Sequence, residues 1–117
     1  MKVYGIPNCD VIKKVLDWFK VNNIDYEFHD YKKDGISQAK LISWVKQVGL
    51  EIVLNKRSTT WRELTTEEQE SASEPAAAIA LMVNNTSLIK RPVIESGDKV
   101  VMVGFNQTQY DQKLKNL

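Results

Sequence analysis

The single cysteine of this 117-residue chain, Cys9, stands where a short β-prone segment turns into a helix. Residues 2–6 are β-prone, Pro7 and Asn8 interrupt them, and apolar residues at helical spacing begin just after Asp10. Unpaired amides and the helix dipole favour an anion at a helix start, where a thiol pKa of ~8.5 can fall to between ~3.5 and ~7.5. The sequence therefore predicts a nucleophilic thiol. The alternative is a small, buried apolar cysteine.

Charged neighbours and the absence of a second cysteine limit this chemistry. Asp10 opposes a thiolate by like-charge repulsion, whereas Lys13 and Lys14, one turn along the predicted helix, favour it. One cysteine cannot form an intramolecular disulfide, and with the lone His29 it cannot assemble a Cys/His zinc site. We therefore expect no metal, and a reaction that Cys9 carries out alone or with an outside partner.

Arginine is scarce in the chain and is placed at two points. Arg57 and Arg62 fall in the loop of residues 55–62, which also holds three hydroxyls and Trp61, and Arg91 precedes a proline. The rigid guanidinium fork suits oxyanions and carboxylates better than the point charge of lysine does. The loop is therefore a candidate anion or partner site. The alternative is a solvated loop in which Trp61 is anchored to the core.

The elements that position Cys9 follow from the hydrophobic pattern. Helical spacing predicts a helix over residues 10–21, and alternation over residues 24–30 predicts a half-buried strand. With residues 2–6 these elements make a β-α-β unit, whose two strands should be parallel. His29 falls on the polar side of the second strand, so we expect an exposed, ordinary histidine.

The middle of the chain carries helix signals and no strand pattern. Residues 50–64 follow no clear period, Thr65 begins a capping-box sequence, and Pro75 can open a helix that runs to residue 84. Ser37 is a predicted cap for a helix over residues 37–48, whose inward residues should be Leu41, Ile42, Trp44, Val45 and Val48.

The last part of the chain returns to strands. Residues 92–95 and 99–102 read as a hairpin around a glycine-containing turn, and an amphipathic helix over about residues 107–114 follows. The order is compatible with an α/β, thioredoxin-like domain that has a four-stranded mixed sheet. We expect a single domain, made of a βαβ half (1–30), a helical insertion (about 36–85) and a ββα half (88–117).

Composition excludes several classes of function. The net charge is +1 and the lysines are scattered, so no concentrated basic face for direct nucleic acid binding is predicted. The longest apolar runs are far shorter than the ~20 residues that span a bilayer, and the first residues lack a signal-peptide core. We therefore expect a cytoplasmic protein without a membrane segment.

Four segments in order resemble the glutaredoxin-linked arsenate reductase (ArsC) family. The chain is most similar to the small YffB-like branch of that family, and Spx-type transcription regulators are more distant cousins. The segments are Tyr4-x-x-Pro7-x-Cys9, the loop of residues 55–62, the run of residues 88–94, and Val103-Gly104-Phe105-Asn106.

The resemblance implies a thioredoxin-like fold and a cis peptide bond before Pro92. Cys9 matches the nucleophile of the family, and Arg91 matches the arginine that holds the oxyanion in arsenate reductases. Lys56 or Arg57 falls near another arginine of that group, and the choice between the two stays open.

The chain also departs from the patterns of its relatives. Arsenate reductases carry a third arginine shortly after the final hairpin, and residues 101–105 here hold no basic side chain. An anionic arsenate adduct needs several donors, so this loss weakens the case for arsenate as the substrate. Many Spx-type regulators have a second cysteine three residues after the first. This chain has Ile12 at that position, so an internal Cys-x-x-Cys redox switch is excluded.

The expected function is that of an arsenate-reductase-like thiol oxidoreductase. Cys9 attacks an oxidised sulfur, and glutathione or glutaredoxin resolves the mixed disulfide. Asn8 and Pro92 complete the expected substrate- or anion-binding set, no cofactor is bound, and we expect a monomer. One alternative is a non-enzymatic, Spx-like regulator that binds RNA polymerase. Another is a family remnant whose cysteine is only structural.

Overall fold

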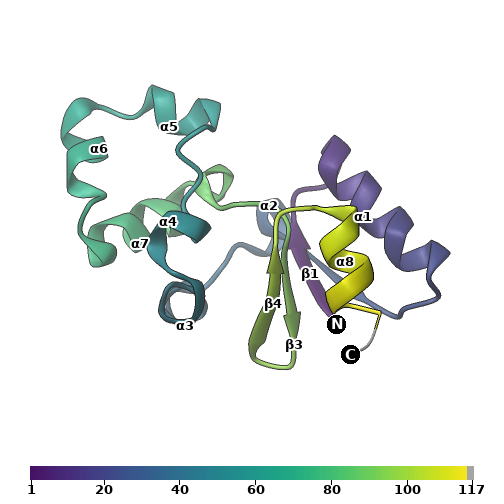
Figure 1. Cartoon of the computed structure of the whole chain (residues 1–117). Coiled ribbons are helices and arrows are strands. Elements are labelled where there is room, and N and C mark those ends of the chain that lie inside the picture. Colours follow the sequence, from purple (N-terminus) through teal and green to yellow (C-terminus); the bar gives the residue numbers. More distant parts are fainter. Residues whose placement is uncertain (116–117) are drawn as a thin grey trace. The chain divides into compact units, whose positions relative to one another are not determined.

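A mixed sheet forms the framework around Cys9 (Figure 1). The structure is a computed structural model and describes residues 1–115. The sheet order is β2-β1-β3-β4, with β1 parallel to β2 and antiparallel to β3, and β3 antiparallel to β4. This four-stranded order confirms the predicted thioredoxin-like α/β fold. The strands are β1 (Lys2–Gly5), β2 (Glu27–Asp30), β3 (Val93–Ser96) and β4 (Lys99–Val103).

The chain divides into two units. The first, here called the sheet unit, consists of Met1–Asp34 and Arg91–Leu117. It holds the four strands together with α1 (Asp10–Val21), α2 (Tyr31–Asp34) and α8 (Gln107–Lys113). The second, the helical unit, is Gly35–Lys90 and contains the remaining helices.

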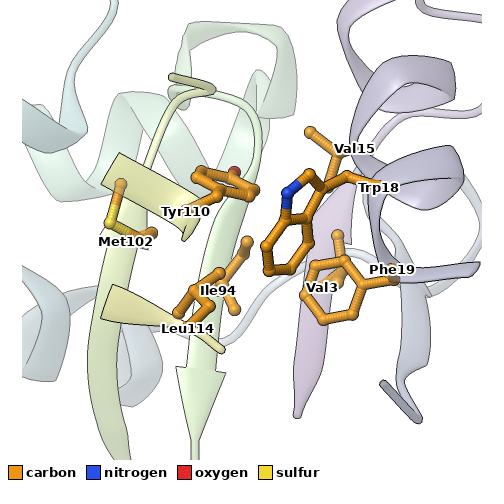
Figure 2. Close-up of a cluster of buried hydrophobic side chains, with 8 residues drawn as sticks. All are labelled: Val3, Val15, Trp18, Phe19, Ile94, Met102, Tyr110 and Leu114. Carbon is orange, nitrogen blue, oxygen red and sulfur yellow. The ribbon is translucent and has the colours of Figure 1, made fainter. Parts of the chain in front are cut away.

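One face of the sheet is covered by α1 and α8 (Figure 1). Figure 2 shows the Trp18 ring lying between Tyr110 and Phe19, and both ring pairs meet edge to face. Aromatic pairs in this arrangement stabilise a core beyond the area that they bury. The cluster joins both helices to β1, β3 and β4, and its members are Val3, Val15, Trp18, Phe19, Ile94, Met102, Tyr110 and Leu114.

Two polar contacts fix α8 against its surroundings. The indole nitrogen of Trp18 donates to the Asp111 carboxylate at 2.9 Å. The Tyr110 hydroxyl donates to the Gly104 carbonyl at 2.6 Å, which ties the helix to the end of β4. Because buried donors are costly when unpaired, these bonds hold the register of α8 as well as adding to stability.

The second strand is shorter than its alternating pattern predicts. Ladder pairing with β1 begins only at Glu27, so β2 covers the last four residues of the predicted range. Upstream, the Ile24 amide bonds to the Phe19 carbonyl at 3.0 Å, which keeps this segment against the end of α1. Ile24 and Tyr26 still pack against the core, so the alternation reflects burial rather than strand pairing.

The helical unit starts as the sequence predicts. Ser37 caps α3 (Gln38–Val48) by accepting from the Lys40 amide at 3.1 Å, and Gly49 follows the helix with a φ of +97°. The predicted inner face of this helix was partly wrong. Leu41 and Trp44 are buried as expected, whereas Ile42 is 36% exposed. The later helices are α4 (Leu50–Val53), α5 (Thr59–Glu63), α6 (Thr66–Ser71), α7 (Pro75–Asn84) and the short 3-10 helix η1 (Thr86–Leu88).

Local signals account for the later helix starts. The capping box at Thr65 is confirmed, since its side chain and the Glu68 side chain each accept the other's backbone amide. Pro75 is the first residue of α7, as predicted. Residues 50–64 showed no period because α4 and α5 are only four and five residues long. Within residues 1–115, no helix is both long and apolar enough to cross a membrane.

Two valines on α1 offer a matched test of this core. Val15 is fully buried, whereas Val21 is 79% exposed. We expect Val15→Ala to lower the free energy of unfolding by about 2 kcal/mol, since it removes two buried methyl groups and leaves a cavity. Val21→Ala should change it by less than about 0.5 kcal/mol. Urea denaturation measures both, and equal losses would contradict the described packing of α1.

Candidate functional site

Cys9 is the N-cap residue of α1. Its backbone is extended, with φ −96° and ψ 131°, and its carbonyl accepts the Lys13 amide at 3.0 Å. The thiol is half-buried, and it makes no capping hydrogen bond to the described first turn of the helix. The amides at the start of a helix have no partner within the helix. The predicted position at a helix start is therefore confirmed, and the sulfur is not used as a structural cap.

Asn8 forms the turn between β1 and α1. Its φ is +64°, in the left-handed region that residues other than glycine rarely adopt. Asparagine is tolerated there more readily than most residues. This conformation turns the chain between Pro7 and Cys9, and so it determines the direction in which α1 leaves the strand.

Arg91 and Pro92 lie at the same end of the sheet as Cys9. The first residue of β3 pairs with Tyr4, one residue before β1 ends, and Arg91 and Pro92 come directly before β3. The Gly104 amide, just after β4, donates to the Pro92 carbonyl at 2.8 Å. The Arg91-Pro92 peptide bond is cis, which confirms what the family resemblance implied.

The sheet face opposite α1 and α8 carries a buried carboxylate. Glu95 is 2% exposed and accepts a hydrogen bond from the Tyr4 hydroxyl at 2.7 Å. Burial and this bond raise the pKa of Tyr4 above its usual range. Burial also raises the pKa of Tyr31, and Tyr4 adds to the rise, while the positive charge of Arg91 opposes it. Arg91 is thus electrically coupled to this buried cluster.

His29 belongs to the same face, and the prediction that it is exposed was wrong. It is half-buried, because it pairs with Tyr4 across the strands and its ring centre lies 4.8 Å from the Tyr4 ring. The centre of the Tyr31 ring lies 6.1 Å from the centre of the His29 ring. The polar side of this strand is therefore packed with aromatic rings instead of facing water.

Lys56 and Arg57 lie together in the helical unit. Both line a hollow of about 210 Å³, which Lys90 also enters. The Lys56 ammonium sits 5.4 Å from the centre of the half-buried Trp61 ring, a cation–π contact. The four predicted site residues of the sheet unit thus gather at one end of its sheet, and the two of the helical unit share one hollow.

Among residues 1–115, no three His, Cys, Asp or Glu side chains are grouped as metal ligands.

A comparison with protein families decides the relationship of this chain. The model described as the ArsC family matches residues 4–113. The chain belongs to the ArsC family. It is 41% identical over 108 residues to an uncharacterized protein of Haemophilus influenzae, covering 92% of this chain and 93% of that protein.

Solved structures of ArsC relatives match nearly the whole chain. One, named YffB, is 39% identical with a TM-score of 0.90, and the match covers 97% of each chain. An arsenate reductase (ArsC) related protein from Brucella melitensis is 41% identical with a TM-score of 0.76, covering 97% of this chain and 93% of that one. The sequence resemblance to the ArsC family and its YffB-like branch is thereby confirmed.

Sequence reasoning missed the Tyr4–Glu95 pair and the role of Lys90 in the hollow. A signal for the first existed, because Glu95 follows an apolar run within a predicted strand, where a charged residue is unusual. No local signal marks Lys90. Its position beside residues 55–57 depends on pairing between segments that are distant in the sequence.

The left-handed turn at Asn8 allows a direct test. We expect Asn8→Ala to lower the free energy of unfolding by about 1 kcal/mol, because alanine lacks the polar group that eases a positive φ. Asn8→Gly should stay within about 0.5 kcal/mol of the parent, since glycine accepts this conformation freely. Chemical denaturation of the two variants side by side gives the comparison. A glycine variant as unstable as the alanine variant would contradict the proposed role of the turn.

The buried tyrosines predict a loss of stability in alkali. The folded-state pKa values of Tyr4, Tyr31 and Tyr110 lie above the usual 10. Above that pH the unfolded chain releases these protons before the folded chain does. The contribution of the three tyrosines to the free energy of unfolding is therefore fully present below about pH 10 and declines above it. Tyr110→Phe should reduce this decline, as measured by denaturation between about pH 9 and pH 11. An unchanged decline in the variant would rule out a contribution from Tyr110.

Proposed function

We propose that this ArsC-family protein is a thiol oxidoreductase in which Cys9 is the nucleophile and glutathione is the external thiol. One observation carries the proposal. Cys9 is half-buried at the N-cap of α1, its sulfur is not used as a cap, and Arg91 precedes the strand that starts at the same end of the sheet. The setting is a reducing compartment such as the cytoplasm, where such thiols stay available.

The position of Cys9 supports a thiolate during the reaction. The first-turn amides of α1 have no intrahelical partners and carry the positive end of the helix dipole, which favours an anion at the N-cap. Asp10 is the first residue of the helix and is exposed, so water screens its opposing charge. The thiolate is the attacking species in exchange with disulfides.

The reaction proceeds by two exchanges with outside thiols. The Cys9 thiolate attacks a substrate disulfide, forms a mixed disulfide and releases one substrate thiolate. A glutathione thiolate then releases the second substrate thiol and leaves glutathione on Cys9, and a second glutathione restores the Cys9 thiolate as oxidised glutathione departs. Two glutathione molecules are oxidised for each disulfide reduced. An outside thiol is required because Cys9 is the only cysteine of the chain.

Arg91 supplies a positive charge at the end of the sheet where Cys9 lies. Its guanidinium is proposed to hold a carboxylate of glutathione or to stabilise the departing thiolate, with Asn8 and Pro92 shaping the same end of the sheet. Lys56 and Arg57 are proposed anion ligands on the helical unit. Arsenate is a weaker candidate, since residues 101–105 offer no basic side chain to a bulky oxyanion.

Two matched substitutions test the proposal. Oxidised glutathione should add one glutathionyl group to the protein, and Cys9→Ser should abolish this gain in intact mass. Arg91→Gln should slow the reaction about tenfold, as expected for the loss of one charge-assisted contact. Arg62→Gln is the control. Arg62 is exposed on α5, so its substitution removes the same charge at another place.

Two results would contradict the proposal. The first is a Cys9 that stays unmodified by oxidised glutathione and reacts with iodoacetamide at neutral pH no faster than free cysteine does. The second concerns Arg91 alone. If Arg91→Gln and Arg62→Gln slow glutathionylation equally, the guanidinium has only a general electrostatic effect.

A further inference from the structure

Tyr31 is a buried tyrosine at the end of the sheet where Cys9 lies, and the proposed reaction does not use it. β1 and β2 are parallel and pair along their whole lengths, so the two strands end together. Cys9 follows β1 after the turn, and Tyr31 directly follows β2. The Tyr31 side chain is only 1% exposed. It therefore cannot reach a substrate, and any part that it plays in the reaction has to act through a neighbour.

The pairing registers place Tyr31 and Arg91 on either side of β1. Continued past the last ladder pairs, the parallel register sets Tyr31 beside Ile6, and the antiparallel register sets Arg91 beside the same residue. Neighbouring strands lie about 4.8 Å apart, so the two backbones that flank β1 are separated by about 10 Å. The long side chains of tyrosine and arginine can span that separation.

Ring packing fixes the Tyr31 side chain on the sheet face opposite α1 and α8. Its ring is stacked on that of Tyr4, with centres 6.3 Å apart and planes 30° apart, and it also meets the His29 ring. Tyr4 is itself held, because its hydroxyl donates to the buried Glu95 carboxylate at 2.7 Å. Buried networks of this kind rigidify their members. The Tyr31 hydroxyl is therefore held in a defined position.

Arg91 acts electrostatically on this hydroxyl. Burial is the main cause that raises the pKa of Tyr31, and the positive charge of Arg91 lowers it. Coulomb energies fall with distance, and salt screens charges that are more than about 10 Å apart, so the guanidinium lies near the hydroxyl. The oxygen of a neutral hydroxyl carries a partial negative charge. Its attraction for a guanidinium is stronger in a buried setting than in water.

We propose that Tyr31 is a positioning residue for Arg91. Its hydroxyl oxygen attracts the guanidinium and limits the positions that Arg91 takes at the Cys9 end of the sheet. The inference rests on the proposed function, in which Arg91 holds a glutathione carboxylate or stabilises a departing thiolate. An arginine that is already held in place loses less conformational entropy when it binds its ligand. Tyr31 thereby favours the reaction without touching the substrate.

A double-mutant cycle tests the role in the reaction. Tyr31→Phe keeps the ring and removes the hydroxyl, so glutathionylation of Cys9 by oxidised glutathione should slow about threefold. In the Arg91→Gln background the same substitution should change the rate less than about 1.5-fold, because the group that it positions is gone. Tyr26→Phe is the matched control and should leave the rate unchanged, since Tyr26 precedes β2 at the opposite end of that strand. Equal slowing by Tyr31→Phe in both backgrounds would overturn the inference, because a purely structural effect acts in both.

Tyrosine NMR tests the placement without any reaction. The full chain with Cys9→Ser, labelled with carbon-13 at the tyrosine Cζ atoms, gives one signal for each of the four tyrosines. Arg91→Gln should shift the Tyr31 signal more than the Tyr26 signal, whereas Arg91→Lys, which keeps the charge, should shift it less than Arg91→Gln does. Arg62→Gln should leave the Tyr31 signal in place. Tyr31→Phe and Tyr26→Phe assign the signals, and dispersed amide signals check that each variant folds.

The two experiments separate this inference from the proposed function. A Tyr31 signal that Arg91→Gln and Arg62→Gln shift equally overturns the inference, and the result of the Cys9 glutathionylation experiment stands unaffected. A Cys9 that does not react with oxidised glutathione removes the proposed thiol chemistry. A Tyr31 signal displaced by Arg91→Gln alone then still supports the placement of Arg91 by Tyr31.

Discussion

The pairing of Tyr4 with the first residue of β3 determines where the candidate site lies. β1 and β3 are antiparallel neighbours, so the chain leaves β1 toward Cys9 at the same end where Arg91 and Pro92 lead into β3. Thiol and guanidinium stand far apart in the sequence, and no local pattern brings them together. The hydrogen-bonded ladder places both at the same end of the sheet. Its register is strictly specified, because a shift of one residue would move every side chain of β1 to the other face.

The two faces of the sheet make different contributions. On one face, Trp18 and Tyr110 pack edge to face and hold α1, and with it Cys9, against the strands. On the other face, Tyr4 satisfies the buried Glu95 carboxylate and Tyr31 is coupled to the charge of Arg91. A buried carboxylate is costly without such partners. The apolar face therefore fixes the position of the thiol, and the polar face sets the electrostatic surroundings of Arg91.

Much of the fold was predictable from local sequence signals. Ser37, Thr65 and Pro75 each mark a helix start that the structure confirms, because caps and first-turn prolines act through neighbouring backbone groups. Predictions that depended on burial were less accurate. His29 is half-buried where exposure was expected, and Ile42 is partly exposed where burial was expected. Periodicity shows which residues share a face, but the packing of other elements decides what covers that face.

By itself, the sequence determined the α/β class, the strand-turn-helix position of Cys9 and the family to which the chain belongs. These features depend on neighbouring residues or on short motifs that can be recognised in the linear sequence. The tertiary structure alone decided the Tyr4–Glu95 pair and the meeting of Lys90 with Arg57. Both arise from main-chain pairing between distant segments. Such pairing is cooperative across the whole sheet or bridge, so no single segment of the sequence encodes it.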